Sequence, residues 1–294
     1  MILRMDRLQT ELPMPKSPSP NDAAALQELL GGKYGEMSTL MNYTFQSFNM
    51  RGRIQIRPFY DLIANIATEE YGHIELVSYA INMLLTGTAK RDPDPVTAPL
   101  EGAKDARNSY HYLASGQAAL PMDSMGNWWN GSYVTCTGNL KTDLLFNFNL
   151  ECQARANKIR AYETVKDPCA RAMVGYLLVR GGVHIVAYAK ALEKLTGVDV
   201  GKLLPIPDVS NKKFPEARVH EEKGLHRKLY QFSPTDYATA NKIWNGPHPE
   251  DGQELMFEHL PKDFGVPVPD LVAEPQINAP LDPDTLADLL KKMK

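Results

Sequence analysis

Four long stretches of the chain place hydrophobic residues at the 3.6-residue spacing of an amphipathic α-helix. They cover about residues 21–50, 58–87, 140–165 and 168–195. Pro58 and Pro168 suit the first turn of a helix, and Gly87 and Gly197 suit the position just after one. The pattern therefore predicts four helices, each long enough to cross a small domain.

The first predicted helix follows a Pro/Ser-rich segment, residues 13–20, and its predicted N-cap is Asn21 or Asp22. Gly31 and Gly32 fall inside this helix, and each weakens it by about 1 kcal/mol relative to alanine. Hydrophobic residues nevertheless continue at helical spacing on both sides of the two glycines. We therefore expect one continuous helix here.

Short connections join the first helix to the second and the third to the fourth, so each pair is predicted to form an antiparallel hairpin. Between the pairs lies a connection of residues 88–138, which is rich in glycine, proline and aromatic residues. A connection of this length lets helices 2 and 3 run parallel, as in ferritin-like proteins. We predict an all-α fold: a ferritin-like four-helix bundle, residues 21–196, with a long crossover between helices 2 and 3.

The chain changes character after Gly197. Twelve of the 22 prolines lie beyond the fourth predicted helix, and helical spacing is largely lost there. One short helix is predicted to start at Pro283, with Asp282 as its cap. The remainder is too apolar to be simply disordered. We expect an extended proline-rich C-terminal tail, residues 197–294, that packs on neighbouring subunits, and an N-terminal arm, residues 1–20.

Composition narrows the class of protein. An apolar fraction of 43% and a charged fraction of 23% are ordinary for a soluble globular protein, and a net charge of -3 indicates no nucleic-acid or membrane partner. The sequence shows no secretory signal and no apolar run near the ~20 residues of a membrane span. Cys136, Cys152 and Cys169 lack CxxC spacing, which favours the reducing cytoplasm, and we expect all three to be buried.

Each predicted helix carries a candidate metal ligand near its middle. The candidates, in chain order, are Glu36, Glu70, His73, Glu151 and His184. Glu70 and His73 form an ExxH motif, whose spacing places a carboxylate and an imidazole on one face of a helix. Dinuclear metal proteins of the four-helix class combine such a motif with a lone glutamate from the preceding helix.

Each candidate also has a simpler interpretation. A lone ExxH is common by chance, and a single buried histidine is more often a core residue than a ligand. Glu69 also lies within reach of His73; the ExxH pattern favours Glu70, and Glu69 remains the alternative. An unpaired carboxylate in an apolar helix costs much free energy. Five such residues at matching depths in four apolar helices therefore favour a shared cation site.

The second half of the chain departs from a symmetric arrangement. A repeat of ExxH would place a glutamate three residues before His184, where the chain has Gly181. The predicted site thus has three carboxylates and two imidazoles, one ligand fewer than most di-iron oxidases. Open coordination positions of this kind suit a small oxygen-containing substrate.

Three segments resemble the manganese catalase family: EEYGH at residues 69–73, LECQAR at residues 150–155 and VRGGVH at residues 179–184. The chain length, the long crossover and the proline-rich tail are also similar. The resemblance implies that two hydrogen peroxide molecules give dioxygen and two waters while the metal pair cycles between Mn(II) and Mn(III). It also implies a homohexamer with intertwined tails.

The resemblance further implies two manganese ions per subunit, joined by oxo, hydroxo or water bridges and by the carboxylate of Glu70. The ligands that it implies are Glu36, Glu70, His73, Glu151 and His184. Oxygen and imidazole ligands suit manganese and iron equally, so the choice of manganese comes from the resemblance alone.

Tyr43 and Lys158 each lie two turns from a ligand on their own helix and are candidates for groups that orient the ligands. Some relatives carry an arginine immediately before the third-helix glutamate and a glutamate three residues before the last histidine. This chain has Leu150 and Gly181 at those positions. Lys158 is the candidate to move protons in their place; the alternative is an exposed surface lysine.

Two other functions fit the same helices. A di-iron oxidase or oxygenase would require the sixth carboxylate, and a metal-storage or structural coat protein of this family would look the same in sequence. Weaker candidate sites are a structural calcium ion near Asp61 and a metal held by residues 220–222 with His226.

Overall fold

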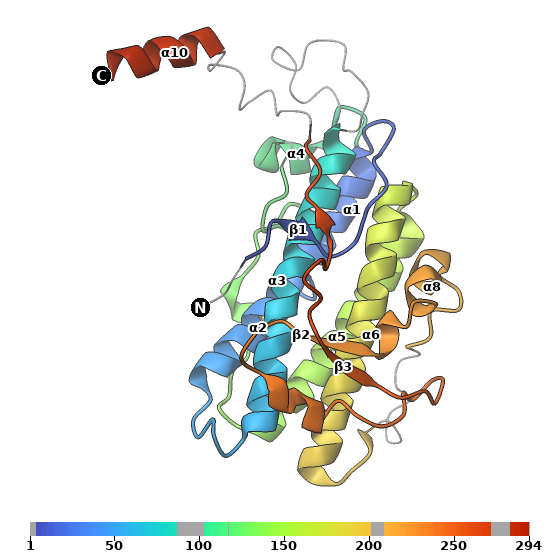
Figure 1. Ribbon diagram of the computed structural model, residues 1–294. Coiled ribbons are helices and arrows are strands. Elements are labelled where there is room, and N and C mark those ends of the chain that lie inside the picture. Colours follow the sequence, from blue (N-terminus) through green and yellow to red (C-terminus); the bar gives the residue numbers. More distant parts are fainter. Residues whose placement is uncertain (1–3, 87–102, 117, 201–208, 272–282, 294) are drawn as a thin grey trace.

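The computed structural model describes residues 4–86, 103–116, 118–200, 209–271 and 283–293. Its helical body consists of α1 (Pro20–Gly31), α2 (Glu36–Asn49), α3 (Arg57–Thr86), α5 (Leu140–Thr164) and α6 (Pro168–Thr196). Helices α1 and α2 both pack against α3 and α5, so together they take the place of the first predicted helix (Figure 1). The described protein is mostly helical, as predicted.

The first predicted helix is broken into two. Helix α1 ends where the N–H of Gly32 donates to the carbonyl of Glu28, and α2 begins at Glu36. A Cβ atom on Gly31 would lie 2.3 Å from the backbone nitrogen of Met122, so only glycine permits this approach. The prediction of a continuous helix was wrong because periodicity cannot show a contact with a distant segment.

The predicted cap of α1 was also wrong. The helix begins at Pro20 with Ser19 as its N-cap residue. The carboxylate of Asp22 instead accepts hydrogen bonds from the two backbone N–H groups of residues 166–167, at 3.0 and 2.7 Å. This carboxylate joins the start of α1 to the turn between α5 and α6. Asn21 accepts from a backbone N–H beyond α3.

The other three predicted helices lie within a few residues of their expected bounds. The side chain of Asp167 caps α6 by accepting from the N–H of Cys169, and Gly197 ends the helix with a left-handed backbone at φ 72°. Contrary to expectation, α6 has the length and composition of a membrane-spanning helix. Of its most apolar 18-residue window, however, 94% is buried inside the bundle.

Two apolar clusters fill the bundle. One includes Leu76 and Leu177, and the other includes Ile66 and Ile185, so the clusters are separated along both α3 and α6. Between them lies a layer of buried polar and charged side chains: Glu36, Glu69, Glu70, His73, Glu151, Lys158, Arg180 and His184. This layer is the position at which the fold holds the candidate site.

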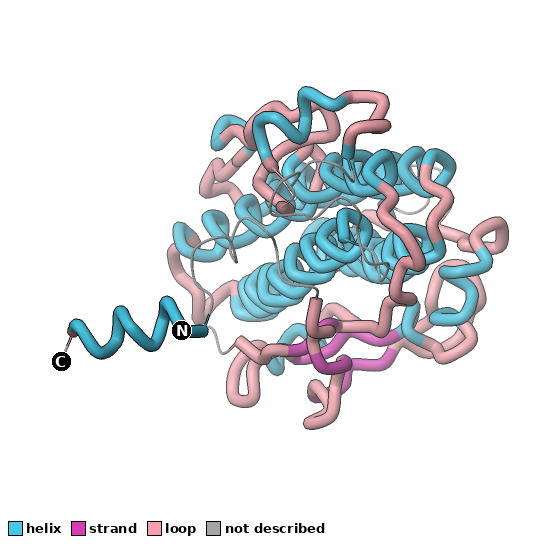
Figure 2. The backbone as a smooth tube through the Cα atoms, turned by 90° about the horizontal axis from the view of Figure 1, so that it is seen from above, coloured by secondary structure: helices cyan, strands magenta, loops and turns pink. Residues whose placement is uncertain are grey.

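The tail has more regular structure than predicted. Its elements are α8 (Pro215–Glu221), η3 (Leu225–Arg227), β2 (Lys228–Gln231), η4 (Ala238–Lys242), β3 (Met256–His259) and β4 (Val266–Pro267). Strands β2 and β3 pair in parallel, and β4 pairs antiparallel with β1 (Arg7–Leu8) from the N-terminal arm. These strands lie on one side of the helices (Figure 2). Because both pairs join residues far apart in sequence, local patterns did not predict them.

Residues 209–271 pack against the helices of their own chain. Trp244 is buried, and its indole N–H donates to the carbonyls of Arg227 at 3.2 Å and Met256 at 3.0 Å. The short helix α10 (Pro283–Lys292) begins at the predicted proline, whereas its predicted cap, Asp282, lies outside the described residues.

Between α3 and α5 the described chain contains α4 (Ser109–Ser115) and the 3-10 turn η2 (Gly131–Tyr133). Cys136, in the loop after this turn, is exposed, so the expectation of three buried cysteines was wrong. Cys169 is buried and Cys152 is partly buried; burial raises the pKa of both thiols to about 12.

Two glycine variants test the close contact that breaks the first predicted helix. We expect Gly31→Ala to lower the free energy of unfolding by about 1–3 kcal/mol, because backbone atoms of Met122 cannot move aside as a side chain can. Gly182→Ala is the control. Outside its own helix turn, none of the described residues would lie within 4 Å of the new Cβ, so we expect a change between zero and a gain of about 1 kcal/mol. Urea unfolding measures both, and equal effects would contradict the interpretation.

Candidate metal centre

The structure brings the five predicted ligands together in two buried clusters. Each cluster has three members whose ligand atoms lie within 4.8 Å of one another. The clusters are Glu36, Glu70 and His73, and Glu70, Glu151 and His184. Because Glu70 belongs to both, the arrangement has room for two cations with one carboxylate between them.

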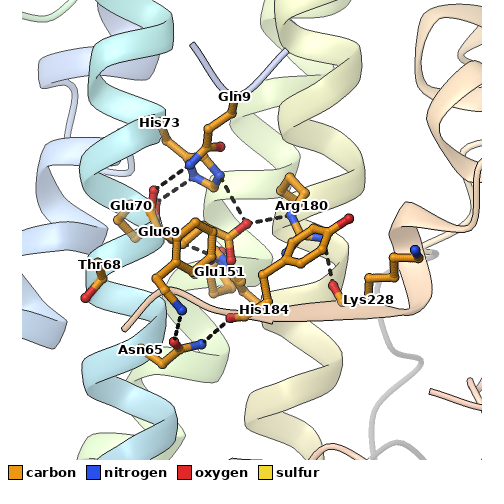
Figure 3. A network of polar contacts seen from close by, with 12 residues as sticks. Gln9, Asn65, Thr68, Glu69, Glu70, His73, Glu151, Arg180, His184 and Lys228 are labelled. Atoms are coloured by element: carbon orange, nitrogen blue, oxygen red, sulfur yellow. Dashed lines mark hydrogen bonds and ion pairs between the residues drawn. The ribbon is translucent and has the colours of Figure 1, made fainter. Parts of the chain in front are cut away.

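Glu70 contacts both imidazoles, and Figure 3 shows it together with His73 and His184. Its Oε2 is 3.0 Å from Nδ1 of His73, and its Oε1 is 2.8 Å from Nδ1 of His184. The imidazoles stack with 5.6 Å between their centroids. Glu36 approaches the first Nδ1 atom and Glu151 the second, each at 3.3 Å. In both imidazoles it is thus Nδ1 that faces the carboxylates of the predicted ligands.

The break in the first predicted helix positions one of these carboxylates. Glu36 is the first residue of α2, and the first N–H groups of an α-helix generally lack the carbonyl partners four residues earlier that later residues have. The partial positive charge at a helix N-terminus favours a carboxylate there. The glycine-containing turn therefore places Glu36 in the polar layer and supplies part of the field that stabilises its charge.

Glu69 is a separate part of the site. Its Oε2 lies 3.1 Å from Nε2 of His184, and its Oε1 lies 3.7 Å from Nε2 of His73 and 2.5 Å from Nε of Arg180. Adjacent residues on a helix point about 100° apart. Glu70 consequently faces the Nδ1 atoms, whereas Glu69 faces the Nε2 atoms on the other side of the imidazoles.

Charge balance in this buried layer depends on protons. Four carboxylates face two cations, Lys158 and Arg180. The carboxylates are Glu36, Glu69, Glu70 and Glu151. Burial alone would lower the pKa of His73, but the carboxylates of Glu70 and its neighbours outweigh burial and raise this pKa to about 10. The pKa of His184 is also raised, against burial, by the carboxylates around it. Cations that bind here therefore displace protons.

The donor atoms fit divalent metal ions. Within the part of the chain that the structure describes, Oε2 of Glu151 and Nδ1 of His184 are buried and make no hydrogen bond, although carboxylate oxygens lie close to the latter. Buried polar atoms that converge without making hydrogen bonds are costly unless a cation binds them. Carboxylate and imidazole ligands suit manganese, iron and other first-row transition metals.

Comparison with known proteins agrees with this geometry. The family model of manganese-containing catalase matches residues 1–294. The chain belongs to this family. It is 32% identical to a manganese catalase of Bacillus subtilis, with 85% of this chain and 88% of that protein aligned. It is 30% identical to a manganese catalase of Lactiplantibacillus plantarum, over 85% and 89% of the two chains.

A solved structure of a family member supports the fold. The manganese catalase KatB from Anabaena superposes with a TM-score of 0.55 at 22% identity, covering 80% of this chain and 93% of that one. At this level of identity the likeness concerns the fold. The side-chain positions described for the polar layer are those of this protein's own structure and are not inferred from KatB.

Lys158 is not the surface lysine of the alternative interpretation. It is 2% exposed, and its Nζ lies 2.8 Å from Oε1 of Glu36. Burial alone would lower the pKa of Lys158, but Glu36 and Glu151 raise it. A Cβ on Gly181 would lie 3.4 Å from this Nζ and 4.0 Å from the Glu151 carboxylate. The ammonium group of Lys158 thus lies next to the space that a longer side chain at position 181 would occupy.

Tyr43, a candidate for an orienting group, contacts one of the five predicted ligands. It is fully buried, and its hydroxyl donates to Oε1 of Glu151 at 2.7 Å. Its ring lies 5.2 Å from that of Tyr188, a buried tyrosine that the sequence analysis did not single out. Arg180 was quoted only as part of a motif. The sequence could have identified it, because a charged residue inside the apolar helix α6 requires a buried partner of opposite charge.

The candidate calcium ligand Asp61 already has hydrogen-bond partners. One of its oxygens accepts from the backbone N–H and hydroxyl of Thr239, at 3.1 and 2.6 Å, and the other accepts from Arg57 at 3.2 Å. These bonds join the start of α3 to η4. A calcium ion at Asp61 would have to displace these donors.

The weak candidate with residues 220–222 is not assembled. His226 instead lies with His248 and Asp251, whose ligand atoms are within 4.8 Å of its own. Local groups already use this cluster: the carboxylate accepts from His226 at 2.9 Å and has Arg227 at 3.9 Å. The nearby arginine makes the cluster unfavourable for a divalent cation.

Removal of the buried ammonium group tests the charge balance of the centre. In protein stripped of metal with a chelator, we expect Lys158→Met to lower the free energy of unfolding by about 3 kcal/mol, because Glu36 would be left buried without its cation. Denaturant titration measures this loss, and manganese should recover part of it. Lys166→Met, at an exposed position, is the control. Equal unfolding midpoints for both variants would show that Lys158 does not balance Glu36.

Proposed function

We propose that this protein disproportionates hydrogen peroxide into dioxygen and water at a dinuclear manganese centre. The ligands are Glu36, Glu70, His73, Glu151 and His184. The observation that carries the proposal is the sharing of Glu70 by two buried three-residue clusters. Membership of the manganese-containing catalase family supports the choice of metal and of reaction.

The manganese pair, when bound, supplies the redox chemistry that takes two electrons from one peroxide and returns them to another. The chain contributes geometry and proton handling. Glu70, which belongs to both clusters, would hold both metal ions, while Tyr43 fixes Glu151 by donating to its Oε1. Two apolar clusters enclose the layer, which limits the entry of larger substrates and strengthens electrostatic interactions inside it.

Protons must move because the oxidation of one peroxide releases two and the reduction of the other consumes two. We assign this role to Lys158. Its Nζ contacts Glu36, lies near the Glu151 carboxylate and can hold a proton between the two half-reactions. Leu150 and Gly181 cannot carry protons at the positions where some relatives have ionisable residues.

A di-iron oxidase or oxygenase is less well supported. Within the described residues, the only other carboxylate in the layer is Glu69, and it contacts Arg180 and the outer imidazole nitrogens. The sixth carboxylate ligand of that class therefore has no counterpart. A metal-storage or structural coat protein would have the same metal site. Turnover of hydrogen peroxide distinguishes a catalase from such a protein.

We propose the ferritin-like crossover between α3 and α5 and a cytoplasmic homohexamer, in which the end of the tail packs on neighbouring subunits. Leu290 and Met293, at 54% and 82% exposed, are apolar residues near the C-terminus available for such contacts. Three free cysteines accord with a reducing compartment. We propose no calcium ion near Asp61, because both of its carboxylate oxygens already accept hydrogen bonds.

The first test is oxygen release from hydrogen peroxide by the purified protein, with elemental analysis of the same sample. We expect about two manganese ions per chain and rapid oxygen release. In Glu70→Ala both should be lost, because this residue joins the clusters. Glu193→Ala, at an exposed position on α6, should retain both. Two manganese ions without oxygen release would refute the reaction, and iron in their place would favour the oxidase.

The second test concerns proton transfer. We expect Lys158→Met to retain manganese but to lose about 100-fold in kcat, the usual contribution of a positioned acid or base. Methylamine added to the solution should restore part of the rate by replacing the lost ammonium group. Lys166→Met again serves as the control. Wild-type kcat and an unchanged pH profile in Lys158→Met would assign proton transfer to another group.

A further inference from the structure

A buried ion pair lies directly behind the two imidazoles. Nε of Arg180 is 2.5 Å from Oε1 of Glu69, and both side chains are 0% exposed. Neither residue belongs to the ligand set. The carboxylate nevertheless contacts Nε2 of His184 at 3.1 Å and lies 3.7 Å from Nε2 of His73. One carboxylate thus faces the outer nitrogens of both imidazoles (Figure 3).

The C-terminal tail holds Arg180 in place. Its Nη1 donates to the carbonyl of Leu225 at 2.9 Å and to that of Lys228 at 2.8 Å. Its guanidinium also lies 5.6 Å from the centre of the Tyr230 ring. These three residues belong to η3 and β2. The arginine therefore joins the tail, through two backbone carbonyls, to the carboxylate behind the imidazoles.

The tail strand is itself bound to α3 at the same level. The side-chain amide of Asn65 donates to the carbonyl of Tyr230 at 2.8 Å and accepts from the N–H of Phe232 at 2.9 Å. The amide of Asn65 thus donates to a strand carbonyl and accepts from a strand N–H, as the backbone of a neighbouring β-strand would. Strand β2 is consequently fixed to α3 through Asn65 and to α6 through Arg180, the two helices that carry the histidines.

An imidazole can present either nitrogen to a metal, and the partner of the other nitrogen decides which one. In this site both Nδ1 atoms face Glu70, so a metal bound at Nδ1 would leave the proton of each imidazole on Nε2. Glu69 lies within hydrogen-bond distance of Nε2 of His184, at 3.1 Å, and its other oxygen makes a longer, 3.7 Å ion-pair contact with Nε2 of His73. The orientation of the two imidazole ligands therefore depends on one carboxylate and on the arginine that holds it.

We propose that Glu69 and Arg180 are positioning residues, and that the tail segment 225–230 holds them so that both imidazoles turn Nδ1 toward the metal positions. This inference deepens the proposed function and rests on it. It gives the tail a role within its own subunit, since without the two carbonyls the guanidinium would lose its fixed position. Metal affinity is then a property of the whole chain and not of the four-helix bundle alone.

Manganese affinity tests this role without relying on activity. A chelator competition on chelator-stripped protein gives the dissociation constants, and electron paramagnetic resonance reports the environment of the bound manganese. We expect Arg180→Met and Glu69→Gln each to weaken manganese binding about 10- to 100-fold and to alter the spectrum. Arg180→Lys should restore part of the affinity, because it keeps the charge but cannot reach Glu69 and both carbonyls together.

Two further variants separate positioning from general stability. Arg171→Met removes another arginine of α6 from an ion pair, the 2.8 Å contact with Glu216, and should leave manganese affinity unchanged. Asn65→Leu releases β2 from α3 without touching a ligand, and should weaken binding by a smaller factor. If Arg180→Met does not fold, the isosteric Glu69→Gln variant carries the test.

The outcomes are distinct from those of the proposed function. Folded Glu69→Gln protein with wild-type affinity and spectrum would overturn the positioning role, whatever the activity of the wild type. Tight binding of two manganese ions by the wild type, weakened in both variants, would support it even if no oxygen were released. Absence of oxygen release in that case would refute the catalase reaction but not the positioning role of Glu69 and Arg180.

Discussion

Four carboxylates buried in one layer of an apolar bundle are the constraint on which the rest of this structure depends. Their charges repel one another, and in surroundings of low dielectric constant the repulsion is several times stronger than in water. Lys158 and Arg180 supply two of the compensating charges. The imidazoles supply the rest when protonated, and two divalent cations can replace those protons. The layer is therefore built to bind cations.

The helices around this layer are arranged to meet that constraint. Apolar clusters above and below it provide the burial that stabilises the fold, which leaves the layer free to carry charge. The glycine-containing turn after α1 starts a new helix at Glu36, so one carboxylate gains a helix N-terminus. This departure from a regular four-helix bundle thus has an electrostatic consequence for the site.

The two ends of the chain complete the surroundings of the site. The side chain of Gln9 donates to the backbone carbonyl of Glu69 and accepts from the hydroxyl of Tyr176. The tail reaches the same place through Arg180. Segments that appear peripheral in the sequence therefore contact groups directly behind the imidazoles. A bundle without these segments would keep the five candidate ligands but lose part of what orients them.

The sequence by itself determined the helical class, three of the four long helices and the five residues that converge. Periodicity and ExxH spacing are local properties, and a buried charge in an apolar helix is visible without a structure. Only the tertiary structure decided that the first helix breaks at Gly31 and Gly32, because the contact lies with a distant backbone segment. It also separated Glu69 from Glu70, since both lie within reach of His73 and only the position of His184 and Arg180 distinguishes them. The paired strands of the tail and its contact with Arg180 likewise depend on residues far apart in sequence, which no local pattern can bring together.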